Sequence, residues 1–514
     1  MLNSQNGLEM QLDVLFVSPN SSRSAYQALA DDYSAIEPPT WALLLAESCR
    51  SKGFGVAILD ADAERLDPEN AAKRAIEENP RLVCLVVYGQ NPNSGTTNMV
   101  GALAFASQLR QIDPSFKIAI VGSHTSALPM EVLGYNCIDI VILNEGVYAL
   151  HNLLRSDLGS ELSKVKGIGY KNEGKLVLNT PEGVVPNDRM DIDLPGYAWD
   201  LLPKKSKDLD LYRAHFWHTG YDHETRTPFA AIYSSLGCKY GCDFCMINIV
   251  NRVNNGEDVT AADSKGMRFW SPEFVLREMG KLADMGVNTL RISDEMFFLD
   301  RRYFEPLLKG VIDRGYDFNM WAYARVDTVR EKYLEMFKKA GVNWLGIGIE
   351  AGNQLVRKEV SKGTFKDVNI RDVVTSIRNS DINVGANYIF GFPEDDRTTV
   401  AETLQLSLEL CTEFANFYPC QALPGSPLHL QARLNGWKLP ETYEGFGFLS
   451  YEAQPLPTKF LSAKEVLQLR DDAWHTYFSY EPYLQLVEKK FGAKQRQNVE
   501  EMSKIRLRRK LLGH

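Results

Sequence analysis

The first 150 residues alternate short apolar runs with stretches of helical periodicity. The apolar runs, each the length of a β-strand, are residues 13–17, 56–59, 82–87, 117–121 and 138–143. The stretches between them, which have apolar residues at helical spacing or begin with Pro or Thr, are residues 40–52, 68–78, 97–112 and 129–133. Strands that alternate with helices form a parallel sheet with crossover helices, so this region predicts a doubly wound, Rossmann-like α/β domain.

The turns that follow these strands are rich in glycine and in small hydroxyl residues. Doubly wound domains bind ligands at the carboxyl ends of their strands, where glycine allows a close backbone approach and hydroxyl groups supply hydrogen bonds. The candidate ligand residues in these turns are Ser18, Asn20, Tyr88, Gln90, Gly122, Ser123, His124, Thr125, Glu145 and Gly146. Ordinary loop chemistry explains any one of these turns taken alone.

A second alternating series begins at Phe229. Its expected strands are residues 229–234, 289–293, 318–323, 344–349, 382–390 and 414–422, and helical stretches such as 272–285 and 303–314 separate them. Six β/α units in about 195 residues are too few for an eight-fold barrel, so the pattern predicts a partial (β/α)6 TIM-type barrel. The active site of such a barrel lies at the carboxyl ends of its strands.

These patterns divide the chain into four expected parts. The doubly wound domain takes residues 1–160, a connector takes 161–228, the barrel takes 229–427, and a small, mostly helical region takes 428–514. The connector contains a hairpin and an aromatic, His-rich stretch at 212–223, which is expected to pack the junction or to line a shared cavity. The last part contains a capping box, Ser462 to Glu465, which marks the start of a helix.

Composition narrows the class of protein. The 514 residues carry a formal charge of −9, which argues against a protein that wraps nucleic acid. One basic segment, with nine Lys or Arg between Lys489 and Lys510, is expected to be a solvated terminal helix, with contact to an anionic substrate as the alternative. No apolar run is long enough to span a membrane, and the first residues do not resemble a signal peptide. We therefore expect a cytoplasmic protein with reduced cysteines and no membrane partner.

Three of the eight cysteines stand apart from the others. Cys238, Cys242 and Cys245 follow the first barrel strand with the spacing Cys-x3-Cys-x2-Cys, and Gly241 eases the turn between them. Three thiolates cannot complete a tetrahedral zinc site, and no fourth ligand occurs at the usual spacing. They can hold a cluster of four irons that leaves one iron open. The other five cysteines stand alone and are expected to behave as small hydrophobic residues.

This loop resembles the cluster motif of the radical S-adenosylmethionine (SAM) superfamily. The resemblance implies that SAM chelates the open iron and is cleaved to a 5′-deoxyadenosyl radical. It also extends to the later barrel strands, each of which carries a matching residue. The resemblance implies that Asp294 and Glu295 contact the methionyl ammonium of SAM and that Arg325 contacts a carboxylate. It also implies that Glu350 accepts hydrogen bonds from the ribose hydroxyls and that Ile389 and Gly391 pack against the adenine. A structural ion pair is the alternative role for the acidic residues.

The amino-terminal domain extends the resemblance to the cobalamin-binding radical SAM enzymes. The matching segments are Glu37-Pro-Pro39, the Gly122–Pro129 segment and Asn144-Glu-Gly146, although the Asp-x-His-x-x-Gly motif that supplies an axial histidine in many cobalamin domains is absent. The resemblance implies a 4Fe–4S cluster, SAM and cobalamin as cofactors, and a reductant protein such as flavodoxin or ferredoxin. Because the Asp-x-His-x-x-Gly motif is absent, we expect the corrinoid to bind without a histidine beneath the cobalt.

The family resemblance leads to one main hypothesis and two alternatives. The main hypothesis is that the enzyme methylates an unactivated carbon of a small molecule by way of the adenosyl radical and methylcobalamin. The first alternative is a cobalamin-binding radical SAM enzyme that catalyses a cyclisation, rearrangement or oxidation without methyl transfer. The second is a cobalamin sensor, which would need neither the cysteine triad nor the SAM-binding residues.

Overall fold

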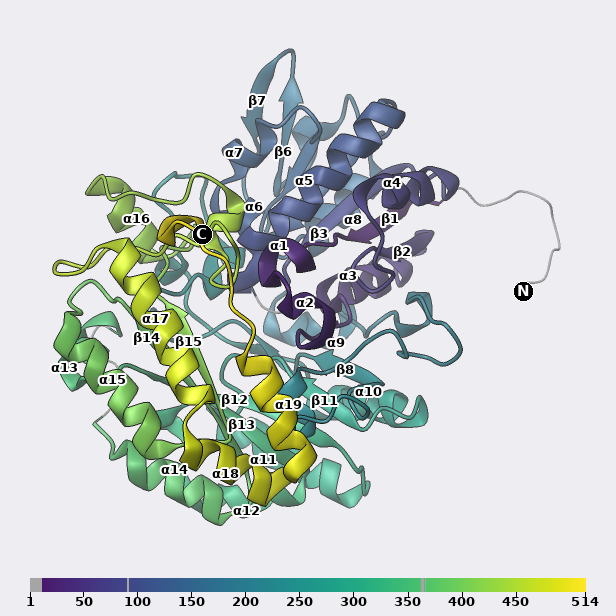
Figure 1. The fold of residues 1–514 in the computed structure, drawn as a ribbon. Coiled ribbons are helices and arrows are strands. Elements are labelled where there is room, and N and C mark those ends of the chain that lie inside the picture. Colours follow the sequence, from purple (N-terminus) through teal and green to yellow (C-terminus); the bar gives the residue numbers. More distant parts are fainter. Residues whose placement is uncertain (1–11, 90–91, 362–364, 366) are drawn as a thin grey trace.

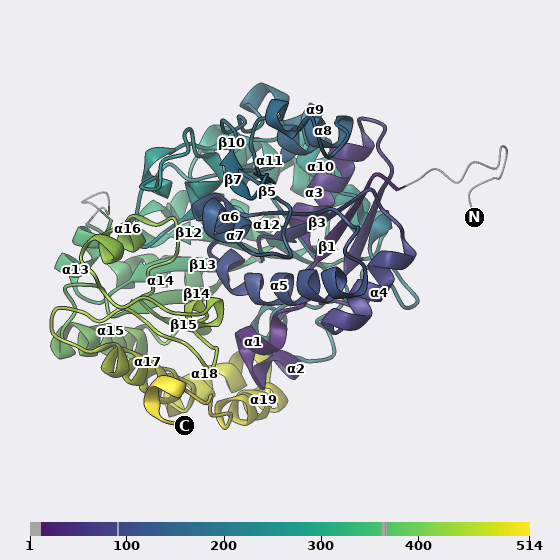
Figure 2. The same ribbon diagram turned by 90° about the horizontal axis from the view of Figure 1, so that it is seen from above.

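The computed structural model describes residues 12–89, 92–361, 365 and 367–514. Figure 1 shows an amino-terminal α/β domain packed on a curled sheet, with the last helices along the outside of that sheet. Figure 2 shows the same arrangement from above. No helix of the described residues is both long and apolar enough to cross a membrane.

The strands of the amino-terminal domain form one sheet in the order β2-β1-β3-β4-β5-β6-β7. The first five are parallel, and the last two form an antiparallel extension of the sheet. Their bounds are β1 Val14–Ser18, β2 Val56–Asp60, β3 Leu82–Val87, β4 Ile118–Gly122, β5 Ile140–Ile142, β6 Ile168–Asn172 and β7 Lys175–Leu178. The five predicted parallel strands are confirmed.

Helices cover both faces of this sheet. Val14 and Phe16 of β1 join one buried cluster, which includes α3 (Thr40–Arg50) and α8 (Val147–Arg155). Leu15 and Val17 join the other, which includes α4 (Pro68–Glu77) and α5 (Gly95–Ile112). Because successive strand residues face opposite sides, burial on both faces explains why the strands are continuously apolar. The shorter helices are α1 Ser22–Tyr26, α2 Leu29–Asp32, α6 Ser123–Ala127, α7 Pro129–Leu133 and α9 Met190–Asp193.

The hairpin that was assigned to the connector belongs to this first sheet. Val141 of β5 pairs with Gly169 of β6, and Gly169 pairs in turn with Leu178 of β7. A domain boundary after residue 160 would therefore cut through hydrogen-bonded strands. The sequence pattern did identify the hairpin, but it carries no information about which sheet edge the hairpin joins.

The second sheet is an open, parallel half-barrel with the strand order β15-β14-β13-β12-β11-β8. Its strands are β8 Phe229–Ile232, β11 Thr289–Ile292, β12 Asn319–Arg325, β13 Val342–Glu350, β14 Asn383–Phe390 and β15 Phe414–Pro419. The crossover helices are α10 Pro272–Asp284, α11 Arg301–Asp313, α12 Leu334–Lys339, α13 Gln354–Val360, α14 Ile370–Asn379 and α15 Arg397–Leu410. The predicted partial barrel is confirmed.

Aromatic residues of the connector pack at the start of the barrel strands. The Trp217 ring lies 3.8 Å from that of Trp321, 5.5 Å from that of Trp344 and 5.0 Å from that of Phe414, measured between centroids. All three partners lie at or near the beginning of their strands. The connector therefore fills the end of the barrel opposite the expected site.

The carboxyl-terminal region packs along the half-barrel. Its helices are α16 Pro427–Leu434, α17 Ala463–Phe478, α18 Glu481–Phe491 and α19 Ala493–Ser503. The predicted capping box at Ser462 and Glu465 starts α17. The basic segment is not uniformly solvated, because Arg509 is fully buried and its guanidinium group donates two hydrogen bonds to Asp471. Burial without a carboxylate partner would be costly for this charge, so Asp471 accounts for its position.

Candidate active site

The three cysteines lie in a loop that follows the short strand β9 (Ser235–Leu236), which pairs with β10 (Arg268–Phe269). Asn248 holds the start of the loop, because its Oδ1 accepts from the Cys238 amide at 2.9 Å and its Nδ2 donates to the Cys238 carbonyl at 2.8 Å. The Cys245 amide donates to the Cys242 carbonyl at 3.2 Å, which forms a tight turn. The backbone thus brings all three thiols into one half-buried loop.

The donor set of this loop fits an iron–sulfur cluster. Burial raises the pKa of Cys238 to about 11 and that of Cys242 to about 12, and it raises the pKa of Cys245 well above the usual value of a thiol. Ionised Cys238 raises the pKa of Cys242, and ionised Cys242 and Cys238 both raise the pKa of Cys245, so thiolates here need a bound cation. Within the described ranges, no three His, Cys, Asp or Glu side chains converge on a single metal ion.

Asp294 and Glu295 are adjacent and were predicted to share one role, but their side chains have different surroundings in the structure. Asp294 is 1% exposed, and it accepts hydrogen bonds from the Ser234 amide at 2.6 Å and from the Ser235 hydroxyl at 2.5 Å. It therefore ties the end of β8 to the end of β11. Glu295 lines a cavity, and burial raises its pKa to about 7. Of the two, Glu295 is the carboxylate that a ligand can reach.

Arg325 at the end of β12 is held in place by its neighbours. Its Nε and Nη2 donate to the two carboxylate oxygens of Asp327 at 2.6 and 2.8 Å, and its guanidinium group lies 3.8 Å from the centroid of the Tyr240 ring. Arg325 also hydrogen-bonds the thiol of Cys242. The arginine that the sequence assigns to SAM therefore lies against the cysteine loop.

Glu350 at the end of β13 has a backbone conformation that favours glycine. Its φ is +68°, which costs energy for a residue with a side chain and is often found at binding sites. A Cβ atom on Gly348 would lie 2.5 Å from Glu350 Oε1, so Gly348 leaves room for this carboxylate. Burial raises the pKa of Glu350 to about 7. The side chain is therefore confined, and among the described residues Arg325 is the cation that partly offsets the effect of burial on its pKa.

The two predicted adenine residues on β14 have different roles in the structure. Ile389 is partly exposed and alternates with the buried Tyr388 and Phe390, so it lies on the same face of the strand as Asn387. Gly391 has a φ of +86°, and a Cβ atom there would lie 2.5 Å from Val466 Cγ1. Its amide donates to Asp395, which the sequence reasoning missed. Gly391 thus forms a turn, and Ile389 is the residue available for apolar contact.

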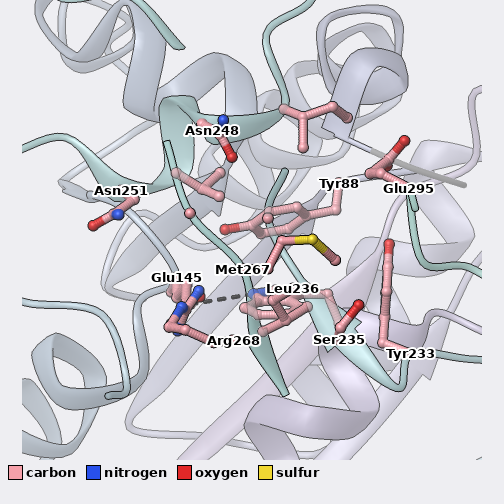
Figure 3. Close-up of a pocket in the computed structure, with 15 residues that line it drawn as sticks. Tyr88, Glu145, Tyr233, Ser235, Leu236, Asn248, Asn251, Met267, Arg268 and Glu295 are labelled. Carbon is pink, nitrogen blue, oxygen red and sulfur yellow. Dashed lines mark hydrogen bonds and ion pairs between the residues drawn. The ribbon is translucent and has the colours of Figure 1, made fainter. Parts of the chain in front are cut away.

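A cavity of about 170 Å³ lies where the two domains meet. Tyr88 and Glu145 follow β3 and β5 of the first sheet, whereas Tyr233 and Glu295 follow β8 and β11 of the second. Figure 3 shows Glu145 and its ion-pair partner Arg268 at one end of the cavity and Glu295 and Tyr233 at the other. The carboxyl-terminal edges of both sheets therefore face one another across one space, which is where each fold type binds its ligand.

The remaining predicted residues of the first domain are distributed around its sheet edge. Ser18 and Asn20 are partly exposed, Gly122 and Ser123 are buried, and Gly146 starts α8 with a φ of +79°. Thr125 Oγ1 is buried and has no hydrogen-bond partner among the described residues, so it is an unused polar atom at this edge. Gln90 lies outside the described residues.

His124 does not face the interdomain cavity. Its Nδ1 lies 3.1 Å from the Thr96 hydroxyl and its Nε2 lies 3.3 Å from Glu131 Oε1, so both ring nitrogens are engaged. His124 lines a different cavity, beside α7. His124 therefore lies apart from Tyr88 and Glu145, because α6 directs its side chain towards Glu131, and its assignment as a cofactor-binding residue stays a prediction.

Several residues that line the interdomain cavity were not predicted. Among them are Trp41, Tyr233, Asn248, Met267 and Arg268. Trp41 donates to the Glu145 carbonyl at 3.2 Å, and Arg268 forms an ion pair with the Glu145 carboxylate, so both hold the predicted turn in position. Trp41 and Arg268 come from distant parts of the chain and share no sequence motif. Arg268 lies in the long loop that follows the three cysteines.

Comparisons with known proteins agree with this architecture. The B12 binding domain profile matches residues 26–154, and the radical SAM superfamily profile matches residues 232–407. An uncharacterised methyltransferase of Pyrococcus horikoshii is 24% identical over 444 residues, which cover 86% of this chain and 88% of that protein. The anaerobic magnesium-protoporphyrin IX monomethyl ester cyclase of Cereibacter sphaeroides is 22% identical over 82% of this chain and 63% of its own length.

A solved structure shows the same fold. The radical SAM methyltransferase TsrM of Kitasatospora setae, with cobalamin and a 4Fe–4S cluster bound, aligns with a TM-score of 0.64 at 16% identity. The alignment covers 96% of this chain and 99% of TsrM. With a B12 binding domain followed by a radical SAM domain, the chain belongs to the cobalamin-binding radical SAM enzymes, whose cofactors are a 4Fe–4S cluster, SAM and cobalamin.

Proposed function

We propose that this chain is a methyltransferase that methylates an unactivated carbon of a small-molecule substrate. The observation that carries the proposal is the interdomain cavity, which is lined by Tyr88 and Glu145 from the cobalamin-type domain and by Glu295 from the barrel. When bound, the cluster and SAM supply hydrogen-atom abstraction, and cobalamin supplies the methyl group. In a methyltransferase of this type, the adenosyl radical and the methyl group must both reach one substrate. Residues of both domains line this cavity, so a substrate held there would lie within reach of both.

The cysteine loop and the barrel edge would hold the cluster and SAM. Cys238, Cys242 and Cys245 supply the three thiolates. Glu295 is the acceptor for the methionyl ammonium, because Asp294 already accepts hydrogen bonds from Ser234 and Ser235. A buried carboxylate without a cation is costly, so a positively charged ligand beside Glu295 relieves that cost.

Three further barrel residues complete the proposed SAM site. Glu350 would accept hydrogen bonds from the ribose hydroxyls, and Ile389 would pack against adenine. Arg325 would face the methionyl carboxylate, since Asp327 and Tyr240 fix the plane of its guanidinium group. A fixed, planar cation recognises a carboxylate better than a mobile one does.

The cobalamin site is proposed at the edge of the first sheet. Tyr88 is anchored there, because its hydroxyl donates to the Asn144 carbonyl at 2.8 Å, and its ring borders the interdomain cavity. Glu145 and the unpartnered hydroxyl of Thr125 offer further polar contacts for a ligand with many amide groups. The two histidines nearest this domain's core, His124 and His151, are engaged by Thr96 and Ser48. We therefore keep the proposal that no histidine lies beneath the cobalt.

The enzyme also needs an electron donor, and we propose a flavodoxin or ferredoxin for this role. All eight cysteines are unpaired. This agrees with the proposed cytoplasmic location, where thiols stay reduced.

Product analysis tests the proposal against its alternatives. Anaerobically reconstituted enzyme is incubated with cobalamin, a reductant, candidate substrates and SAM that carries a deuterated methyl group. A methyltransferase of this type forms S-adenosylhomocysteine and 5′-deoxyadenosine in equal amounts and transfers the label to the product. Turnover with 5′-deoxyadenosine but without S-adenosylhomocysteine would indicate a cyclisation or oxidation, as in the cyclase relatives. Cobalamin binding without any cleavage of SAM would indicate a sensor.

A further inference from the structure

A second and larger cavity, of about 880 Å³, lies behind the loop that follows the cysteines. Residues 247, 248, 250 and 251 of this loop line the interdomain cavity, whereas Arg252 and residues 255–257 line the second one. The loop therefore separates the interdomain cavity from the second cavity. The other walls of the second cavity come from α7, from α16 and from residues 439–444 and 446.

His429 on α16 is an unpartnered polar group that lines this cavity. The residue is only 6% exposed, and its ring makes no hydrogen bond or ion pair with any described residue. Burial, together with Arg433 and His124, lowers its pKa to about 4, so the ring is neutral at pH 7. A neutral imidazole has one nitrogen that accepts and one that donates. Both ring nitrogens of His429 are therefore available to a ligand in the cavity.

Glu131 on α7 supplies a carboxylate near this imidazole. Its Oε1 accepts from the Tyr443 hydroxyl at 2.6 Å and lies 3.3 Å from His124 Nε2. No described residue contacts its Oε2, and its side chain is 46% exposed. Glu131 acts electrostatically on His429, so the two acceptors lie in one region of the cavity.

The charges around the cavity favour a cation. Four glutamates line it, against two arginines: Glu131, Glu257, Glu441 and Glu444, with Arg252 and Arg433. The Arg252 guanidinium group donates to the carbonyls of Ser126, Asn254 and Gly256, so it holds the loop in place and is not free for a ligand. Apolar side chains, among them Leu103, Leu128, Leu439 and Phe446, form the rest of the wall.

We propose that this cavity is a second ligand site, which takes an amphipathic organic cation with a primary ammonium group on an apolar body. An ammonium group has three N–H donors, which suit the free carboxylate oxygen of Glu131 and the accepting nitrogen of His429. The apolar body packs against the leucine and aromatic wall. A carboxylate ligand is disfavoured by the excess of glutamates. Binding at this site can be measured without turnover, so the proposal does not rest on the proposed methyl transfer.

Calorimetric titration of the reconstituted full-length enzyme tests this site with two probes of matched size and opposite charge. We expect phenethylamine to bind and 3-phenylpropionate to give no measurable heat. Glu131→Gln removes the charge while keeping the shape, and His429→Phe removes the acceptor while keeping the volume. Each is expected to weaken phenethylamine binding about tenfold or more, as the loss of a charge-assisted hydrogen bond implies. Glu335→Gln, on the exposed face of α12 where Glu335 pairs with Lys339, is the control and should bind as the wild type does.

Three results would overturn the proposal: no binding of the amine, equal binding of both probes, or amine binding that survives both Glu131→Gln and His429→Phe. If His429→Phe fails to fold, as judged by iron content and thermal unfolding, His429→Leu, which also lacks an acceptor, and Glu131→Gln decide the question. Because heat of binding is measured without turnover, failure here is distinct from failure of the methyltransferase proposal.

Discussion

The different roles of Asp294 and Glu295 can be tested by one matched pair of substitutions. Asp294→Asn and Glu295→Gln each replace a carboxylate by an amide of similar shape at adjacent positions. We expect the first to destabilise the fold and the second to weaken SAM binding. The contrast rests on hydrogen bonds, because Asp294 accepts from Ser234 and Ser235 whereas Glu295 faces a cavity.

The size of each effect follows from these contacts. A buried hydrogen bond to a charged group contributes about 1.5–3 kcal/mol, and an asparagine at 294 keeps one acceptor oxygen for three donors. The loss of one or two such bonds costs about 2–5 kcal/mol, which lowers the unfolding temperature by roughly 5–15 °C for a domain of this size. At Glu295, the loss of one charge-assisted contact to the ammonium weakens SAM binding about 10- to 150-fold.

Thermal unfolding and equilibrium binding of SAM to the reconstituted enzyme measure both effects. Glu295→Gln should unfold at or slightly above the wild-type temperature, because burial of Glu295 already disfavours its charged form. The reasoning is refuted if Asp294→Asn unfolds at the wild-type temperature, or if Glu295→Gln binds SAM as tightly as the wild type. Iron content should be unchanged in both variants.

Three further predictions test the cluster, the ribose contact and a pH-dependent carboxyl group. Alanine in place of any triad cysteine should abolish iron binding and SAM cleavage, whereas Cys84→Ala should only lower the unfolding temperature; full activity in a triad variant would exclude the cluster assignment. Glu350→Gln should weaken SAM binding about tenfold or more with normal iron content, and loss of iron would instead make Glu350 a structural residue. Burial raises the pKa of Asp60 from 3.8 to about 7. Between about pH 4 and pH 7 the folded chain therefore keeps a proton on Asp60 that the unfolded chain loses. The stability of the fold consequently falls as pH rises through this range. Asp60→Asn should therefore unfold at a higher temperature than the wild type at pH 8 and near the wild-type temperature at pH 4, and the same difference at both pH values would contradict this pKa.

The two sheets could be predicted because their strands are buried on both faces or repeat in β/α units, and both patterns are visible in a single sequence. The edge that accepts the β6–β7 hairpin could not be predicted, since the pairing of Val141 with Gly169 depends on tertiary packing. The cysteine loop could be predicted because its chemistry depends on spacing within eight residues.

Residues whose role depends on side-chain direction could not be assigned in this way. Asp294 and Glu295 are neighbours of the same type, and only the path of the chain after β11 decides which one reaches the cavity. His124 lies in a promising turn, but α6 directs it towards Glu131. Tyr233 and Arg268 meet Tyr88 only because the two sheet edges face one another.

The aromatic connector restricts how ligands can enter the interdomain cavity. Trp217 is inserted among aromatic rings at the far end of the barrel, and Arg213 pairs with Ile36 of the first domain. Arg226 donates further hydrogen bonds to the carbonyls of Tyr33 and Ser34. The linker is therefore fastened to both domains, and a hinge that parted them would have to break the hydrogen bonds of Arg213 and Arg226 or extract a buried tryptophan. We infer that large ligands exchange by local rearrangement of the loops around the cavity, so that cobalamin, once loaded, should dissociate slowly.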